Sequence, residues 1–129
     1  MYHTIVIVGN VGRDPEMRYT PSGSAVTSFS VAVSDGFGER KKTIWFRVSA
    51  WEKLAETCNN YLKKGSKVLI EGRLNATDTG NPRTYNRQDG TTAASFEVTA
   101  NVVRFLSSRT ESDESEDMGG IDDGSEIPF

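Results

Sequence analysis

The chain has 129 residues, of which 36% are hydrophobic and 26% charged, and its formal net charge is −3. This length and composition suit a single domain with a modest core and a well-solvated surface. The longest aliphatic run, residues 5–8, is far too short to cross a bilayer, and the N-terminus has no basic region followed by an apolar stretch, so neither a membrane span nor a secretory signal is expected.

The first half of the chain predicts three strands separated by turns. Residues 4–12 form an apolar strand, and residues 19–23 contain the proline and glycine of a tight turn. Apolar and small polar side chains alternate through residues 25–34, which predicts a half-buried strand. A glycine-flanked hairpin tip follows at residues 35–38, and the third strand occupies residues 43–51.

The third strand is the most informative segment, because successive side chains in a strand point to opposite faces. One face is entirely apolar and suits a core: Ile44, Phe46, Val48 and Ala50. The other face carries both tryptophans of the chain among polar residues: Thr43, Trp45, Arg47, Ser49 and Trp51. An aromatic ring stacks an unpaired base of any identity, at about 1–3 kcal/mol per base. A neighbouring arginine neutralises a phosphate or stacks as well.

Two interpretations of these tryptophans stay open at this stage. The rings stack bases, or they pack against the helix or a partner subunit. Arg47 lies two residues after Trp45 and favours base stacking there. Trp51 lies where the strand meets the next element and fits either interpretation equally well.

A single helix is predicted over residues 52–63. Its apolar residues recur at helical spacing and form one stripe: Leu54, Ala55, Cys58, Tyr61 and Leu62. Lysines stand at its C-terminal end, and Gly65 is expected as the C′ residue. Strands resume at residues 67–75 and 94–106, and the polar residues 76–93 between them predict a long exposed hairpin arm.

This order of elements predicts an all-β protein with the OB-fold. Three strands, a helix and two strands within about 110 residues match a five-stranded Greek-key barrel with its helix between strands three and four. Such barrels bind oligonucleotides on one strand face and its flanking loops. Residues 1–107 are expected to form this domain, and residues 108–129 a disordered acidic tail.

Two loops also combine aromatic and basic side chains. Phe37 lies in the hairpin tip before Lys41 and Lys42. In the arm, an aromatic residue stands between two arginines: Arg83, Tyr85 and Arg87. This combination indicates a groove that stacks bases and follows a phosphate backbone, whereas an ordinary solvated hairpin would not need aromatic tips. Further cations are candidates for phosphate contacts or ordinary surface charges: Lys53, Lys63, Lys64, Lys67 and Arg73.

The net charge of −3 conceals a strong asymmetry along the chain. Residues 110–129 contain eight of the 18 acids and no base, so residues 1–109, with ten acids and 15 bases, carry +5. A basic body with an acidic tail is typical of a nucleic-acid binder with an interaction arm, although a solvated globule with an unread tail explains it equally well. The tail ends in residues that together can enter an apolar pocket with a basic rim: Asp122, Asp123, Glu126, Ile127, Pro128 and Phe129.

The residues give little support to enzymatic chemistry. His3, the only histidine, begins the first strand, and Cys58, the only cysteine, falls in the apolar stripe of the helix, so a buried structural thiol is expected. A lone cysteine makes no internal disulfide and indicates a reducing cytoplasm. No CxxC, HExxH or GxxxxGK motif occurs, and no metal or cofactor is expected.

Taken together, these segments resemble the bacterial single-stranded DNA-binding protein (SSB) family over residues 3–106 and at the C-terminal tip. The matching segments are IVGNVGRDPE at 7–16, RY at 18–19, WFRV at 45–48, KLAE at 53–56, YLKKGS at 61–66, IEGRL at 70–74 and IPF at 127–129. The chain departs from the family in its short linker before the tip and in Gly124-Ser125, which separate acids that the family usually has in sequence.

The resemblance implies a non-enzymatic, sequence-independent binder of single-stranded DNA. Such a protein protects exposed strands in DNA replication, recombination and repair, and recruits partner enzymes through its tip. It also implies a homotetramer in the cytoplasm, associated with the nucleoid, with base-stacking aromatics at Trp45, Trp51, Tyr85 and Phe37. Two alternatives stay open: an OB-fold interaction module of a replication-restart complex, and an RNA-binding OB or cold-shock protein.

Overall fold

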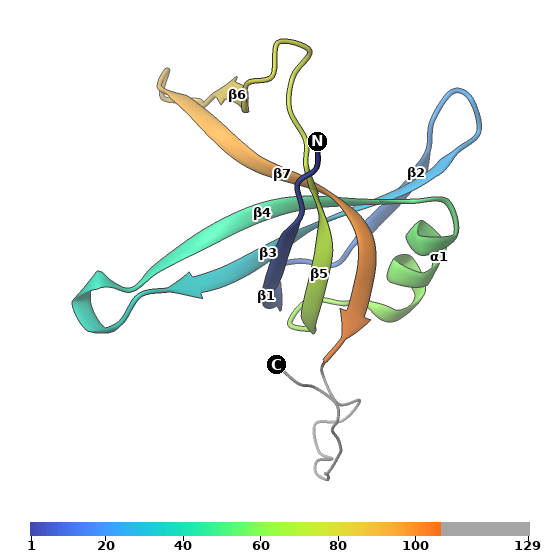
Figure 1. Cartoon of the computed structure of the whole chain (residues 1–129), viewed down its shortest axis with the longest axis horizontal. Helices are drawn as coiled ribbons and strands as arrows, with labels where there is room; N and C mark the ends of the chain where they lie inside the picture. Colours follow the sequence, from blue (N-terminus) through green and yellow to red (C-terminus); the bar gives the residue numbers. More distant parts are fainter. Residues whose placement is uncertain (107–129) are drawn as a thin grey trace, which may run out of the picture.

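Five long strands close into a barrel in the computed structural model, which describes residues 1–106 (Figure 1). They are β1 (Ile5–Val11), β3 (Ala25–Asp35), β4 (Lys42–Trp51), β5 (Lys67–Leu74) and β7 (Thr92–Phe105). The strands follow the order β1-β5-β7-β4-β3, and β3 closes the barrel by pairing with β1 at Asn10 and Val11. The one α-helix within residues 1–106, α1 (Glu52–Tyr61), joins the third and fourth barrel strands, which confirms the predicted OB-fold.

Alternate side chains of the barrel strands form the core. On β4, the predicted inward positions Phe46, Val48 and Ala50 are buried, and each neighbouring strand contributes residues of the same kind. The fully buried branched side chains of the other strands are Val11, Val31, Val68, Ile70 and Val98. Burial of one such side chain stabilises the fold by about 1.5–3 kcal/mol. The period of two that predicted the strands therefore also separates the core from the outer face.

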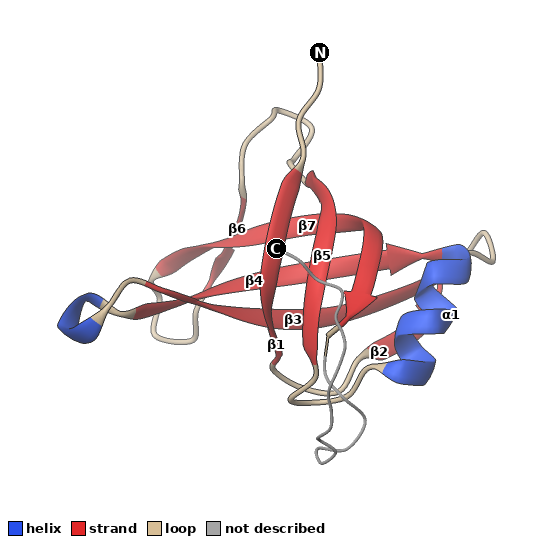
Figure 2. Cartoon of the chain, turned by 60° about the horizontal axis from the view of Figure 1, so that its bottom comes forward, coloured by secondary structure: helices blue, strands red, loops and turns tan. Residues whose placement is uncertain are grey.

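Helix α1 covers one end of the barrel (Figure 2). Ala55 and Cys58 point into the core and are fully buried. The buried hydroxyl of Thr27 on β3 donates a hydrogen bond of 2.7 Å to the carbonyl oxygen of Ala55. This bond joins helix and barrel directly and satisfies a hydroxyl that has no contact with water.

The end of α1 differs from the prediction. The helix stops at Tyr61, and Leu62 is extended (ψ 148°), which lets its side chain enter the core. Tyr61 is 68% exposed, so it does not belong to the buried stripe. Gly65 is not the C′ residue of the helix: it has φ +92° and lies in a turn in which the N–H of Ser66 donates to the carbonyl of Lys63.

Strand β2 (Glu16–Tyr19) was not predicted, and β6 (Arg83–Asn86) was predicted only as part of the hairpin arm, without bounds of its own. β2 pairs with β3 and β6 pairs with the start of β7, so both extend the sheet beyond the barrel. Neither contains a buried residue, and the sequence of each lacks an apolar alternation that would have revealed it. The β3–β4 hairpin and the β6–β7 arm project away from the barrel (Figure 1).

The predicted boundary at residues 107 and 108 and the predicted tail lie outside the described residues. Within residues 1–106, no helix has the length and apolar character that crossing a membrane requires.

Candidate nucleic-acid interface

The outward face of β4 carries both tryptophans, as the alternation predicted. Trp45 is 53% exposed and Trp51 41% exposed, and Arg47 between them is exposed as well. The two indole rings belong to the same face of one strand, six residues apart, which corresponds to about 20 Å along β4. Both rings are therefore outside the core and accessible to a ligand.

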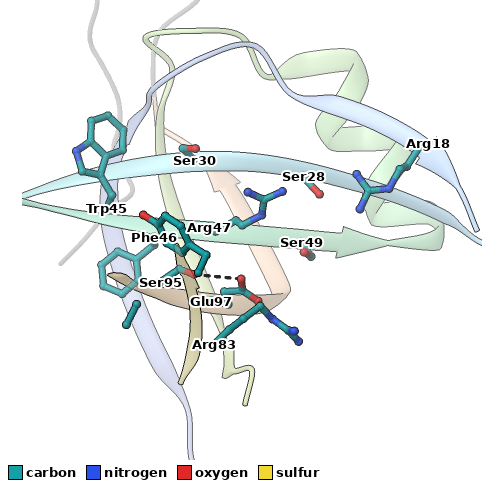
Figure 3. Close-up of a pocket in the computed structure, with 12 residues that line it drawn as sticks. Arg18, Ser28, Ser30, Trp45, Phe46, Arg47, Ser49, Arg83, Ser95 and Glu97 are labelled. Atoms are coloured by element: carbon teal, nitrogen blue, oxygen red, sulfur yellow. Dashed lines mark hydrogen bonds and ion pairs between the residues drawn. The ribbon is translucent and has the colours of Figure 1, made fainter. Parts of the chain in front are cut away.

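A groove of about 590 Å³ lies beside Trp45 and Arg47 (Figure 3). Strands β2, β3, β4, β6 and β7 all contribute to its lining. The aromatic rings of Trp45 and Tyr85 and the guanidinium groups of three arginines line it, the latter being Arg18, Arg47 and Arg83. In Figure 3, Trp45 is at one end, Arg18 is at the other, and Arg47 lies between them.

The groove has space beside Arg47 because the neighbouring side chains are small. On β3, Ser30 lies opposite Arg47 and Ser28 lies opposite Ser49. On the other side, Ser95 of β7 also lines the groove. These hydroxyls give the groove polar hydrogen-bonding groups between its aromatic and basic side chains.

Gly12 determines where the ring of Trp45 lies. A Cβ atom at Gly12 would come within 2.5 Å of the six-membered part of the indole, closer than any real contact of that kind. The indole therefore lies directly against the backbone of Gly12, and no other residue type fits there without moving the ring. This contact holds the ring in place while more than half of the side chain stays exposed.

The arm supplies the opposite side of the groove. Strand β6 pairs with β7 so that Arg83 lies opposite Ser95 and Tyr85 lies opposite Ala93. Arg83 and Tyr85 are two residues apart and share one face of β6, and both line the groove. Tyr85 is 51% exposed. Four residues that the sequence singled out, from two separate segments, thus meet at one site: Trp45, Arg47, Arg83 and Tyr85.

Positive charge in the groove is only partly compensated by the protein. Arg83 Nε lies 3.3 Å from Glu97 Oε1, and Ser95 Oγ donates to Glu97 Oε2 at 3.3 Å. Within residues 1–106, neither Arg18 nor Arg47 forms an ion pair. These two guanidinium groups are available to an anionic ligand.

Other predicted binding residues lie outside this groove. Phe37 is 91% exposed next to the short 3₁₀ helix η1 (Gly38–Arg40) at the tip of the β3–β4 hairpin. Lys41 follows η1, and Lys42 pairs with Asp35 across the hairpin at 3.5 Å. Trp51 lies at the far end of β4, next to α1. These residues lie along the same hairpin but do not line the groove.

The remaining cations are spread over the molecule. Lys53 is on α1, Lys63 and Lys64 are in the turn after it, and Arg73 lies on β5 near the N-terminus. Arg87 lies in the arm's turn, where its guanidinium donates to Thr91 Oγ1 at 3.3 Å. The structure does not bring these five residues into the groove. The predicted partner-binding tip, residues 122–129, lies outside the described residues.

Arg18 is the basic residue of the groove that the sequence analysis missed. It belongs to β2, a strand that the sequence analysis did not predict, so no face of a sheet was assigned to it. Its sequence neighbour, the predicted turn at residues 19–23, is the one signal that pointed to a hairpin and hence to a strand before the turn. The groove serines were missed because small polar residues on an outward face carry no distinctive pattern.

Cys58 is buried, as expected, whereas His3 does not begin the first strand but precedes β1 by two residues. Burial raises the pKa of the Cys58 thiol to about 11, the opposite of the shift that a nucleophilic cysteine requires. His3 Nε2 accepts a hydrogen bond of 3.0 Å from the backbone N–H of Leu74. The described residues contain no group of three or more side chains suited to hold a metal ion.

A closed barrel of this topology, with aromatic and arginine side chains around a surface groove, is typical of the OB-fold class, whose members bind oligonucleotides or oligosaccharides. The model of the single-strand binding protein family matches residues 2–106. The chain belongs to this family.

Curated relatives agree with the family match. The chain is 38% identical to the single-stranded DNA-binding protein of Neisseria meningitidis serogroup A over 112 residues, 83% of this chain and 61% of that protein. It is 40% identical to single-stranded DNA-binding protein 1 of Chlorobaculum tepidum over 67% of this chain and 57% of that protein. It is 35% identical to the single-stranded DNA-binding protein of Oceanobacillus iheyensis over 93% of this chain and 73% of that protein. The chain thus spans about three-fifths of the Neisseria relative.

Proposed function

We propose that this protein binds single-stranded DNA without regard to base sequence. The single observation that carries the proposal is the position of Trp45 beside Arg47 on the outer face of β4, facing a groove that also contains Tyr85. An exposed ring next to a cation serves an unpaired base and its phosphate, whereas a closed duplex offers no base face. The names of the relatives, which refer to single-stranded DNA, support the same ligand.

The proposed mechanism is base stacking combined with phosphate neutralisation. Bases stack on Trp45 and Tyr85, and Arg47 and Arg18 neutralise phosphates along the groove. Stacking tolerates every base because each has a π-face, so binding is independent of sequence. The mechanism requires no metal, cofactor or chemical step. It suits a protein that covers exposed strands during replication, recombination and repair.

The strand is proposed to continue from the groove along the β3–β4 hairpin. Trp51 offers a further ring at one end of β4, and Phe37 offers another near the hairpin tip, with Lys41 and Lys42 beside it. The more distant cations contribute long-range attraction and additional phosphate contacts: Lys53, Lys63, Lys64, Arg73 and Arg87. Such an arrangement produces strong salt dependence, with a slope near −0.7 per neutralised phosphate.

Partner recruitment is proposed for the C-terminal tip, residues 122–129. Its acids and the apolar Ile127 and Phe129 match a pocket that combines a basic rim with an apolar floor. Removing Phe129 is expected to leave DNA affinity unchanged and to abolish capture of replication and repair proteins. Capture that survives this deletion would assign recruitment to another surface.

A homotetramer is proposed from the outer side of β1. Val6 is 53% exposed and Val8 41% exposed on this strand, which is unusual for apolar residues of a sheet face. One edge of β1 pairs with β5 over six residues, whereas the other edge pairs only at Asn10 and Val11. An open edge beside an apolar face is suited to a second copy of the chain.

The proposed location is the bacterial cytoplasm, in association with the nucleoid.

Direct competition tests the proposed function. The full chain is titrated into fluorescently labelled dT oligomer, and unlabelled DNA, RNA of matched length and duplex DNA compete. The expected order of competition is single-stranded DNA first, then RNA, then duplex. Tighter binding of RNA would make this an RNA-binding barrel, and absence of binding to all three would favour a protein-interaction module.

A further inference from the structure

Glu97 places a carboxylate in the groove that is proposed to bind the negatively charged DNA backbone, although like charges repel. Its side chain is only 16% exposed, and it lies on β7 opposite Arg47 of β4 in the parallel register. A carboxylate with so little access to water requires hydrogen-bond donors from the protein. Arg83 Nε and Ser95 Oγ supply them, one to each carboxylate oxygen.

This contact crosses from β7 to β6. Strand β6 consists of four exposed residues and pairs with β7 alone, and a two-stranded ribbon of this kind has little stability by itself. The ion pair fixes Arg83 against β7. Tyr85 lies on the same face of β6, two residues later, so a contact that stabilises this strand against β7 also stabilises the position of Tyr85.

The three arginines of the groove consequently differ. Arg18 and Arg47 have no ion-pair partner within residues 1–106, whereas the charge of Arg83 is compensated by Glu97. A phosphate at Arg83 would also approach the Glu97 carboxylate, which repels it.

We propose that Arg83 and Glu97 form a neutral ion pair that positions Tyr85 in the groove, and that Arg47 and Arg18, not Arg83, neutralise the phosphates there. This inference rests on the proposed function, and it assigns the groove residues to two separate roles. Both members of the pair are positioning residues that act through the aromatic ring of the arm.

The salt dependence of binding separates a positioning residue from a phosphate ligand. Loss of a phosphate contact makes the negative slope of log affinity against log salt shallower by about 0.7 on single strands, whereas loss of positioning lowers affinity at unchanged slope. The sign of the Glu97 effect is equally informative. If Glu97 only repelled DNA, its neutralisation would tighten binding; if it positions Tyr85, neutralisation weakens binding.

The experiment compares full-length Glu97→Gln, Arg83→Gln, their double variant and Arg47→Gln with the unaltered chain. Affinity for labelled dT oligomer is measured by anisotropy across a salt series, and thermal melting verifies that each variant is folded. Asp78→Asn is the matched control, because this exposed acid belongs to the same arm but does not line the groove. Removing its charge is expected to change affinity less than about twofold.

We expect Glu97→Gln and Arg83→Gln each to weaken binding about three- to tenfold, a part of the loss of one stacked base, with the slope unchanged. The double variant is expected to match the single variants, because both act through the same contact. Arg47→Gln is expected to make the negative slope shallower by about 0.7. Tighter binding by Glu97→Gln, or a slope for Arg83→Gln that becomes as shallow as that of Arg47→Gln, would overturn the proposal. Failure of the unaltered chain to bind would instead overturn the proposed function.

Discussion

At the scale of single residues, the position of Trp45 depends on what its neighbours lack. Gly12 has no side chain, so the indole lies against its backbone, and the β3 residue opposite Trp45 is the small Ala32. The neighbouring pairs continue the pattern, because the β3 residues beside Arg47 and Ser49 are both serines. A large ring with small neighbours is exposed on a sheet face, and the groove begins beside it.

Trp45→Ala should lower the affinity for single-stranded DNA by about 1–3 kcal/mol, because one base loses its stacking partner. The barrel should stay folded, since the ring is 53% exposed and makes no part of the core. Oligomer titration and urea unfolding of the same variant measure the two effects separately. Unfolding of this variant would mean that the ring belongs to the core.

Gly12→Ala should weaken DNA binding without destabilising the fold. The new methyl group would meet the indole at 2.5 Å, and the ring is the mobile partner, so it must turn out of its position. The free energy of unfolding should change by less than about 1 kcal/mol. Binding and unfolding curves of Gly12→Ala measure both quantities. Unchanged affinity would show that the orientation of the ring against Gly12 does not matter.

At the scale of elements, the junction of β4 and α1 contains the one described non-glycine residue with a positive φ, Glu52 at +57°. This conformation costs an ordinary residue roughly 1–2 kcal/mol. It occurs where the chain turns from the strand into the helix, directly after Trp51. The strain is therefore located beside an exposed ring of the proposed DNA path.

Glu52→Gly should stabilise the protein by about 1 kcal/mol, because glycine adopts a positive φ without steric cost. Urea unfolding of this variant and of Glu56→Gly measures the difference. Glu56 lies within the same helix at an ordinary position, where glycine should destabilise by about 1 kcal/mol. Destabilisation by both changes would show that Glu52 carries no strain.

The sequence predicted those elements whose patterns arise from burial. Period-two alternation located β3 and β4 and separated Phe46 and Val48 from Trp45 and Arg47, because the core enforces that period. Strands β2 and β6 have no buried residue and pair with the strands that follow them, β3 and β7, so no alternation of apolar side chains marks their bounds in the sequence. Arg18 was missed together with β2. Likewise, the helix ends before Leu62, whose side chain is buried in the core. Helical periodicity does not reveal this end of the helix.

At the scale of the whole molecule, the barrel has two outer faces of different character. One, on β3 and β4, carries Trp45, Arg47 and serines beside the groove. The other, on β1, carries exposed valines and an incompletely paired edge. A protein that assembles through β1 would keep the grooves of its copies accessible to one continuous single strand of DNA.

Val8→Glu tests this assembly. Val8 lies opposite Leu69 on the outer face of β1, and a charge there would have to be buried in an interface. The unaltered chain should have a molar mass of four times 14.2 kDa, and the variant a smaller one, with the barrel still folded. Light scattering at several concentrations measures both. Equal masses for the two proteins would exclude the β1 face from the assembly.

The exposed indole at the groove is the central claim, and tryptophan fluorescence tests it most directly. In Trp51→Phe, Trp45 is the single remaining tryptophan, so the emission reports on this ring alone. Titration with oligo-dT at low salt should quench the emission strongly and saturably, because a base covers the ring. Full binding of the oligomer with unchanged emission would contradict the claim, since the strand would then bind elsewhere on the molecule.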